Sequence, residues 1–338
     1  MPRPVGSLQL LSVGQDRRDT MPPLTLPTST PTQEATLAPA RLKESSQPIA
    51  ALHLFTSTSR EETMFYRDLE AYISNSATEY DILARITQHP DRPRPNRDID
   101  QIFMLPGSQL NQAKLVSDYL RDREVVFVGD GDCMALTLGL LAKEGVIEGP
   151  AFMRVLDFDQ RIVEFIGKAS QQFGFHEKIE AHLYNVKNPI DPRWRHRSDV
   201  FYTNPPYGSR NEGFSAKAFL GRCMELCGPV GSWGIAILPY HHHEEWSRRA
   251  MLSVQSFLLK HGYLVSEMLL EMHSYHLDDN PRLLSGTVVV DRATEVVEPF
   301  GERSLTSEEL SYFYGSRNIA FPDGVDRNGD LYGPAAAT

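Results

Sequence analysis

The chain has few cysteines, no long apolar run and no signal-peptide pattern among its 338 residues. Its three cysteines, Cys133, Cys223 and Cys227, have neither the number nor the spacing of a disulfide framework or a zinc site. No apolar stretch reaches the ~18 residues of a membrane-spanning helix, and the short apolar run at 8–13 does not make a secretory signal. These absences favour a reducing, cytoplasmic setting and no membrane partner.

Basic residues are also fewer than acidic ones. The chain has 34 Lys and Arg and 44 Asp and Glu, which gives a formal net charge of −10. This balance argues against a broad nucleic-acid-binding surface, although Arg193, Arg195 and Arg197 form a local basic cluster. It favours a small cationic ligand, which a negative surface attracts. Apolar residues make up 41% of the chain, which is enough for a sizeable core and excludes global disorder.

Four segments differ in pattern along the chain. Residues 1–48 are rich in Pro, Ser and Thr without apolar periodicity, which predicts a disordered arm. Residues 49–97 predict a small helical module with a Pro- and Arg-rich linker. Residues 98–295 predict the main domain, and 296–338 a C-terminal extension that ends in a loose tail.

Strand and helix patterns alternate through the main domain. Strands are predicted at 124–129, 152–158, 179–185, 199–204, 232–240, 263–272 and 285–292. Helices are predicted at about 60–73, 77–88, 111–122, 133–145, 159–174, 215–228 and 244–262, with Gly145 and Gly174 ending two of them. Continuous apolar strands separated by helices predict an α/β fold with a doubly wound, mostly parallel sheet of Rossmann type. No clear helix separates the last two strands, which favours an antiparallel hairpin at one edge.

The first predicted strand runs into the turn Gly129-Asp130-Gly131-Asp132 and then into a helix. In a doubly wound fold this turn lies at the carboxyl edge of the sheet, where ligands bind. The two glycines let the backbone approach a ligand closely. The third glycine of the dinucleotide fingerprint is missing, since position 134 is Met, and two aspartates would repel a pyrophosphate.

The second predicted strand ends in Asp157-Phe158-Asp159. An acid at this place commonly accepts hydrogen bonds from ribose hydroxyls, and Asp157 is the better candidate. Asp159 begins a helix and is typical of an N-cap. Together the two strand ends predict a nucleoside site without phosphates, which an adenosyl sulfonium would fit.

The fourth predicted strand ends in Asn204-Pro205-Pro206-Tyr207, which resembles the [Asn/Asp]-Pro-Pro-[Tyr/Phe] motif of S-adenosylmethionine-dependent amino methyltransferases. Transfer of carbon from a sulfonium to nitrogen requires the amine lone pair to point at that carbon. The Asn204 side-chain oxygen and the Pro205 carbonyl can accept the amine hydrogens, and two prolines keep the turn rigid. Tyr207 can present its ring to a base or a cation.

The stretch from Asp98 to Arg292 resembles the branched-chain polyamine synthases, also called bis(aminopropyl)spermidine synthases. These are aminopropyltransferases with a methyltransferase-like fold and a Gly-Asp-Asp-Asp signature after the first strand. Gly129, Asp130 and Asp132 match that signature, while Gly131 replaces its middle acid. The resemblance implies a class I methyltransferase-like domain that transfers an aminopropyl group from decarboxylated S-adenosylmethionine to an amine of a polyamine or a related compound.

The resemblance also implies residue roles. Asp132 would take the proton of the attacking amine. Asn185, at the end of the third predicted strand, falls where the family places an acid near the adenine, and its amide can still accept the exocyclic amine proton. Asp130 and Asp132 together would repel a donor carboxylate, which favours the decarboxylated donor over S-adenosylmethionine itself.

Two other functions stay open. A methyltransferase that acts on an amine, for instance of an adenine base, fits the proline motif. A catalytically silent nucleoside-binding scaffold fits the loss of the middle acid at Gly131. The histidine run His241–His243 follows the fifth predicted strand, but neighbouring loop residues point in different directions, so we predict no metal site. The oligomeric state is also open, a homodimer included.

Overall fold

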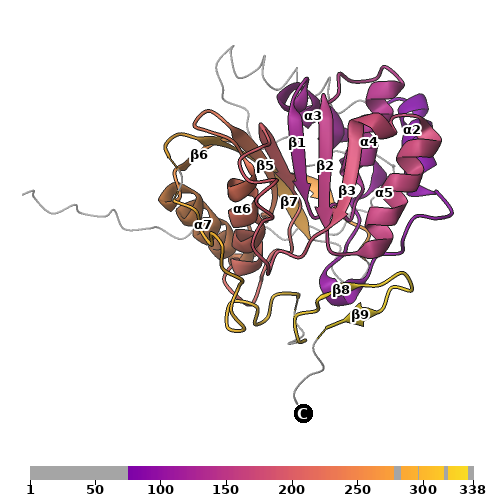
Figure 1. Cartoon of the computed structure of the whole chain (residues 1–338). Helices are drawn as coiled ribbons and strands as arrows, with labels where there is room; N and C mark the ends of the chain where they lie inside the picture. Colours follow the sequence, from indigo (N-terminus) through magenta and orange to yellow (C-terminus); the bar gives the residue numbers. More distant parts are fainter. Residues whose placement is uncertain (1–74, 278–282, 296, 316–318, 334–338) are drawn as a thin grey trace, which may run out of the picture. The chain divides into compact units, whose positions relative to one another are not determined.

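One seven-stranded sheet runs through the part of the chain that the computed structural model describes, residues 75–277, 283–295, 297–315 and 319–333 (Figure 1). Its strands are β1 (Glu124–Val128), β2 (Phe152–Asp157), β3 (Ile179–Leu183), β4 (Val200–Thr203), β5 (Trp233–Pro239), β6 (Tyr263–Ser274) and β7 (Leu284–Arg292). They lie in the order β3-β2-β1-β4-β5-β7-β6. Every pair from β3 to β5 is parallel. This topology confirms the predicted fold class.

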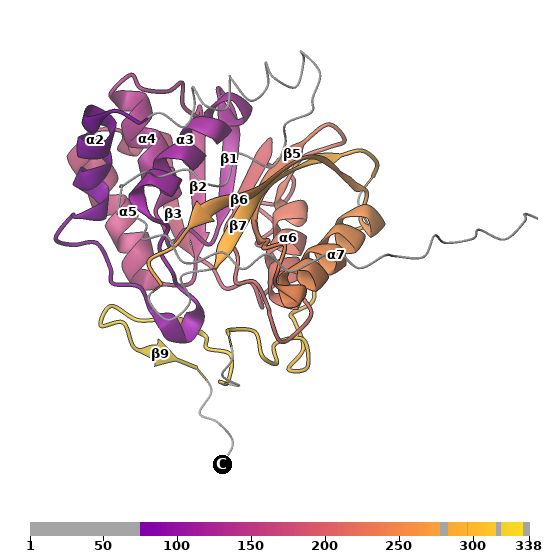
Figure 2. The same ribbon diagram turned by 180° about the vertical axis from the view of Figure 1, so that it is seen from behind.

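The last two strands form the predicted antiparallel pair at one edge. β7 runs antiparallel to both β5 and β6, so it is the one reversed strand of this sheet. Figure 2 shows β6 and β7 side by side along their length, in agreement with their pairing. The hairpin therefore brings the ends of β6 and β7 beside the carboxyl end of β5.

Helices cover both faces of the sheet. They are α2 (Ala77–Thr87), α3 (Pro106–Leu120), α4 (Met134–Lys143), α5 (Gln160–Phe173), α6 (Phe214–Leu226) and α7 (Glu245–Lys260), with short 3₁₀ turns η1 (Arg97–Ile99) and η2 (His176–Lys178). Alternate side chains of β1 show the layers. Val125 and Phe127 pack into a core with α2 to α5, whereas Val126 and Val128 pack into a core with α6 and α7. Because β1 is buried on both faces, successive residues along it are apolar, which explains the continuous apolar run in the sequence.

The helix ends follow local backbone chemistry. Gly145 and Gly174, at φ 74° and 75°, end α4 and α5 in the left-handed conformation, as predicted. α3 begins at Pro106, five residues before the predicted start at 111. Proline fits the first turn of a helix, because N–H groups there have no acceptor within the helix and the absence of one costs no hydrogen bond.

The N-terminal predictions have mixed outcomes. The helix predicted at 77–88 is confirmed as α2, which Ser76 and Glu79 start with a reciprocal capping box. The predicted disordered arm at 1–48 and the predicted helix at 60–73 lie outside the described residues.

The prediction of a loose tail was wrong for residues 323–333. The strands β8 (Gly324–Val325) and β9 (Leu331–Tyr332) pair as a small hairpin, and Val325 donates its N–H to the Phe158 carbonyl at 3.3 Å. Val325 is also fully buried. The tertiary contact with the end of β2 orders this segment, and that contact has no signature in the local sequence.

Two absences from the sequence have structural counterparts. All three cysteines are buried free thiols. Among the described residues, no helix combines the length and the apolar character needed to cross a bilayer.

Candidate functional site

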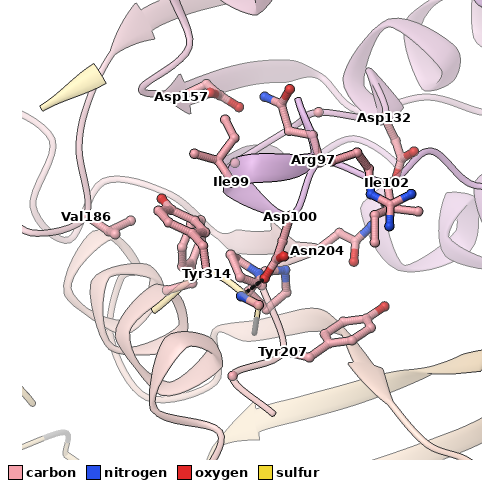
Figure 3. A pocket seen from close by; sticks show the side chains of 18 of the residues that line it. Arg97, Ile99, Asp100, Ile102, Asp132, Asp157, Val186, Asn204, Tyr207 and Tyr314 are labelled. Atoms are coloured by element: carbon pink, nitrogen blue, oxygen red, sulfur yellow. Dashed lines mark hydrogen bonds between the residues drawn. The ribbon is translucent and has the colours of Figure 1, made fainter. Parts of the chain in front are cut away.

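A cavity of about 590 Å³ opens at the carboxyl edge of the parallel strands (Figure 3). It is lined by the turn after β1, the end of β2, the loops after β3 and β4, and the segment around η1. Of the predicted site residues, the lining includes Gly129, Gly131, Asp132, Asp157, Phe158, Asn185, Asn204, Pro205 and Tyr207. The parallel pairing of β1 with both β2 and β4 explains the convergence, because these strands end at the same edge.

Asp130 is the predicted site residue that does not line the cavity. Its carboxylate accepts the N–H groups of Met134 at 2.7 Å and Ala135 at 3.1 Å, in the first turn of α4. The side chain is 2% exposed, and burial raises its pKa. The predicted role in donor binding is therefore not supported for the Asp130 side chain, because free amides at a helix start attract the carboxylate away from the cavity.

Asp157 joins the ends of β1 and β2. One carboxylate oxygen accepts the Asp130 N–H at 2.8 Å, and the other accepts the Asp159 N–H at 2.8 Å. Burial raises the pKa of Asp157 to about 6. The Phe158 N–H is a third backbone donor to this carboxylate, which leaves about one of its four acceptor positions for a ligand hydroxyl.

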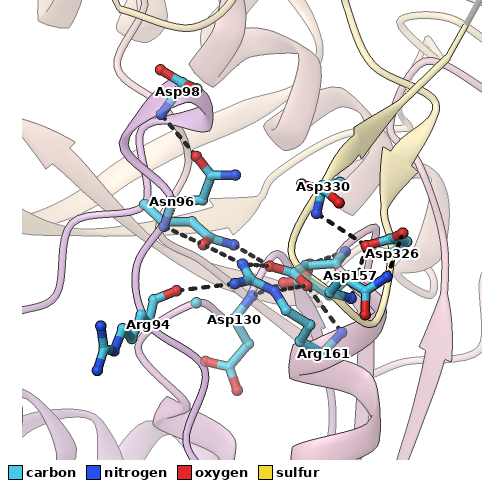
Figure 4. Close-up of polar contacts among 12 residues, drawn as sticks. Arg94, Asn96, Asp98, Asp130, Asp157, Arg161, Asp326 and Asp330 are labelled. Carbon is cyan, nitrogen blue, oxygen red and sulfur yellow. Dashed lines mark hydrogen bonds and ion pairs between the residues drawn. The ribbon is translucent and has the colours of Figure 1, made fainter.

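Asp159 is the N-cap of α5, as predicted. Its carboxylate accepts the Arg161 N–H at 3.0 Å and forms an ion pair with the Arg161 guanidinium at 2.7 Å. Figure 4 shows this guanidinium also reaching the Arg94 carbonyl, at 3.3 Å. Gln101 donates to Asp159 as well, at 2.9 Å. Asp159 thus ties the segment before α3 to the end of β2, beside the cavity.

Asp132 and Asn204 form a hydrogen-bonded pair in the cavity wall. The Asn204 amide nitrogen donates to Asp132 Oδ2 at 2.8 Å, and the Met104 N–H donates to Oδ1 at 2.8 Å. Since its nitrogen faces Asp132, the Asn204 amide oxygen lies on the side away from that carboxylate. Burial raises the pKa of Asp132, while the Met104 N–H and the charge of Arg92 oppose the rise. A carboxylate with a raised pKa is better suited to accept a proton.

Aromatic rings form much of the remaining wall. Phe158 stacks with Tyr314, with ring centroids 6.1 Å apart and an interplanar angle of 10°. Tyr207 hydrogen-bonds through its hydroxyl to Tyr275 at 2.5 Å. Flat rings of this kind pack against nucleobases and against cations.

Asp100, Tyr275 and Tyr314 are among the lining residues that the sequence reasoning missed. Asp100 accepts the Gly315 N–H at 2.6 Å, and burial raises its pKa to about 6. Tyr275 directly follows β6, so its place at a strand end was a signal, whereas Asp100 and Tyr314 lie outside the strand ends.

Asn185 uses its side chain to hold the C-terminal segment. Its amide nitrogen donates to the carbonyls of Pro322 and Asp323, both at 3.0 Å, and its oxygen accepts the Lys187 N–H at 3.0 Å. The residue lines the cavity, but its amide hydrogens are already used. The predicted adenine contact could therefore involve only the remaining lone pair of its oxygen or its backbone.

The histidine loop differs from the sequence interpretation. The rings of His241 and His242 lie parallel, 5.3 Å apart, rather than pointing in different directions. His242 Nδ1 is 2.7 Å from a Glu271 oxygen, and the ligand atoms of His241, His242 and Glu271 lie within 4.8 Å of one another. None of the three lines the cavity, and His242 is exposed. They could come together around a metal ion only at the surface.

Comparison with known proteins places this site in a family. Residues 81–297 match the family model described as the branched-chain polyamine synthase A C-terminal domain. An uncharacterized protein of Methanocaldococcus jannaschii is 31% identical over 207 residues, covering 60% of this chain and 46% of that protein. The N(4)-bis(aminopropyl)spermidine synthase of Thermus thermophilus is 30% identical over 187 residues, covering 55% of this chain and 50% of that protein.

A solved structure agrees with the fold. The branched-chain polyamine synthase from Thermus thermophilus, in complex with N4-aminopropylspermidine and 5′-methylthioadenosine, superposes with a TM-score of 0.59 at 22% identity. The match covers 70% of this chain and 69% of that one. The chain spans about half the length of the curated relatives it matches. Since the family model covers more than half of the chain, this protein belongs to the branched-chain polyamine synthase family, through a region that matches its C-terminal domain.

Proposed function

We propose that this protein transfers an aminopropyl group from decarboxylated S-adenosylmethionine to an amine nitrogen of a polyamine or a related amine. The observation that carries the proposal is the pair of Asp132 and Asn204, joined at 2.8 Å inside a cavity that the predicted nucleoside turn also lines. Two curated relatives are named N(4)-bis(aminopropyl)spermidine synthase, which supports the reaction type. The related Thermus thermophilus structure contains an aminopropylated spermidine and 5′-methylthioadenosine.

The charge of the cavity supports cationic ligands. Three carboxyl side chains, Asp100, Asp132 and Asp157, line it against the single guanidinium of Arg97 among the described lining residues. An acidic cavity attracts a sulfonium and ammonium groups and disfavours a donor that carries its own carboxylate. The decarboxylated donor is therefore the proposed one.

The nucleoside part of the donor would bind at the turn after β1 and the end of β2. Gly129, at φ 71°, adopts a left-handed conformation that lets the turn run close beneath a ligand. A ribose hydroxyl would donate to Asp157, and the base would pack near Phe158 and Tyr314. The sulfonium carbon would then lie toward Asp132.

The amine part of the reaction would use the loop after β4. The Asn204 amide oxygen and the Pro205 carbonyl would accept amine hydrogens and turn the nitrogen lone pair toward the donor carbon. The new N–C bond forms as the C–S bond breaks, and the sulfur keeps that electron pair and leaves as 5′-methylthioadenosine. Asp132 would take the proton of the nitrogen.

The methyltransferase alternative rests on one observation, the Asn204-Pro205-Pro206-Tyr207 motif itself. It predicts the same nitrogen geometry but a donor that keeps its carboxylate. The scaffold alternative predicts nucleoside binding without turnover. All three functions therefore differ in what the protein does with each donor.

The test is a donor comparison with spermidine and other small amines, followed by mass spectrometry of the products. The proposal expects a mass gain of one or more aminopropyl groups from decarboxylated S-adenosylmethionine, together with 5′-methylthioadenosine. A gain of methyl groups only, from S-adenosylmethionine, would establish the methyltransferase alternative. Binding of 5′-methylthioadenosine with no product from either donor would establish the scaffold.

A further inference from the structure

A chain of hydrogen bonds leads from the cavity into the core behind Tyr207. Tyr207 Oη is 2.5 Å from Tyr275 Oη, which is 2.6 Å from Ser285 Oγ. Ser285 Oγ is 2.9 Å from His273 Nδ1, and His273 Nε2 is 2.8 Å from Gln112 Oε1. The five residues come from the loop after β4, the hairpin of β6 and β7, and helix α3. We call this set the tyrosine relay.

The direction of the tyrosine relay starts at Gln112. An amide oxygen can only accept, and Gln112 Oε1 accepts from Thr287 Oγ1 at 2.6 Å as well as from His273. In this orientation of the Gln112 amide, whose nitrogen has no hydrogen-bond partner among the described residues, His273 Nε2 carries a hydrogen. His273 is 1% exposed, and burial lowers its pKa to about 3, so the ring is neutral and has only this one N–H. Its Nδ1 is left as an acceptor.

Each hydroxyl along the tyrosine relay has a single hydrogen. The donor in each hydrogen bond from His273 to Tyr207 is therefore determined by the bond before it. Ser285 must donate to His273 Nδ1, because that nitrogen has no hydrogen of its own. Tyr275 must then donate to Ser285, and Tyr207 must donate to Tyr275. The hydroxyl hydrogen of Tyr207 is thus committed to Tyr275. Toward a ligand, the Tyr207 oxygen can only accept a hydrogen bond.

We propose that the tyrosine relay fixes Tyr207 Oη as a hydrogen-bond acceptor for an N–H group of a cationic amine ligand. Tyr207 then contacts the amine, and Tyr275, Ser285 and His273 are its positioning residues. The inference deepens the proposed function and rests on it for the identity of the ligand. It adds a third acceptor to the Asn204 amide oxygen and the Pro205 carbonyl in the same loop. The cavity would therefore select a nitrogen that donates hydrogens over an ether oxygen of the same shape.

The first test measures the direction of the tyrosine relay without any ligand. In the intact protein labelled with ¹⁵N-histidine, the two ring nitrogens of His273 have distinct chemical shifts that report which one carries hydrogen, and His273→Gln identifies its signals. We expect hydrogen on Nε2 and a bare Nδ1. Hydrogen on Nδ1 would reverse every donor in the chain and overturn the proposal. This result does not depend on whether the protein is an aminopropyltransferase.

The second test measures spermidine and 5′-methylthioadenosine binding by calorimetry. Tyr275→Phe and Ser285→Ala should each weaken spermidine binding about tenfold, because a lost link of this kind costs one hydrogen bond and frees Tyr207 to turn its hydrogen outward. The nucleoside affinity should stay within about twofold. Ser285→Thr keeps the hydroxyl and should restore spermidine binding. Tyr119→Phe is the matched control, because the Tyr119 hydroxyl bonds Glu267 outside the cavity.

The outcomes separate the two proposals. Spermidine binding that depends on Tyr275 and Ser285, without any aminopropyl transfer, would support the tyrosine relay and contradict the proposed function. Aminopropyl transfer with unchanged spermidine binding in both variants would support the proposed function and overturn the relay. A wild-type protein that does not bind spermidine would overturn the amine contact whatever the histidine spectrum shows.

Discussion

The two carboxylates that anchor opposite halves of the cavity differ in what they bind. Asp157, in the proposed nucleoside half, takes hydrogen bonds from backbone N–H groups. Asp132, in the proposed amine half, takes one from the Met104 N–H and one from the Asn204 side chain. Asp157 therefore holds the shape of two loops, whereas Asp132 holds a side chain that can itself touch a ligand. Two carboxylates of similar burial therefore differ in their partners, which are backbone groups alone at Asp157 but include a cavity-lining side chain at Asp132.

The largest expected effect comes from Asp132→Asn. The amide keeps the shape and most hydrogen bonds but removes the basicity, so turnover should fall by ~10²–10⁴, the usual range for loss of a general base. The affinity for 5′-methylthioadenosine should change little, because the groups of the nucleoside half remain. Steady-state kinetics and calorimetry on the same preparation check both statements.

Asp191→Asn serves as the matched control for that variant, since Asp191 pairs with Arg193 at the surface and does not line the cavity. Full turnover in Asp132→Asn would assign the proton acceptor to another group. Lost nucleoside affinity with intact turnover of the bound complex would move Asp132 to the donor-binding half.

Asp157→Ala should show the opposite pattern. Nucleoside affinity should fall by ~1.5–3 kcal/mol, the scale for losing a hydrogen bond to a charged acceptor. Stability should fall too, because the N–H groups of Asp130 and Asp159 lose their buried partner. Calorimetric titration and urea unfolding measure the two effects. Equal nucleoside affinity in wild type and variant would remove Asp157 from the binding site.

Asp130→Ala tests whether the two aspartates of one turn, Asp130 and Asp132, have different roles. The free energy of unfolding should fall by about 1–3 kcal/mol, since the first-turn amides of α4 lose their buried acceptor. Turnover should change far less than in Asp132→Asn. A loss of turnover as large as that of Asp132→Asn, with the fold intact, would contradict the capping role.

The last expected effect is a slope of stability with pH. The folded pKa values of Asp157 and Asp100 are raised to about 6 from a reference of 3.8, so the folded state binds more protons than the unfolded state between these values. Stability should therefore decrease as the pH rises from about 4 to 6. Urea midpoints across this range measure the slope, and Asp100→Asn should make it shallower. An unchanged slope in that variant would show that Asp100 titrates normally.

Several features of this protein followed from the sequence alone because they depend on neighbours along the chain. The apolar strands, the glycine ends of α4 and α5, and the N-cap at Asp159 each arise from local backbone and hydrogen-bonding chemistry. The order of strands and helices was enough to predict the sheet and the edge where its motifs meet. The resemblance of the residues around these strand ends was also enough to predict the family.

Packing between distant elements selects which side chains of those motifs face the cavity. Asp130 and Asp132 look equivalent in the sequence. In the structure, Asp130 accepts hydrogen bonds from the start of α4, whereas Asp132 accepts one from Asn204, 72 residues away in sequence. That partner depends on β1 lying beside β4, where Phe127 pairs with Tyr202 and both strands end at one level.

The tyrosine relay shows the same limit most clearly. Tyr207, Tyr275 and Ser285 meet only because the β6–β7 hairpin folds against the end of β5, beside the loop after β4. Gln112 joins them from α3, 161 residues before His273. Hydrogen-bond partners of this kind have no spacing or periodicity that a sequence could display, because packing between distant elements creates them. The sequence alone therefore determined where the site lies, and the packing determined which atoms it offers to a ligand.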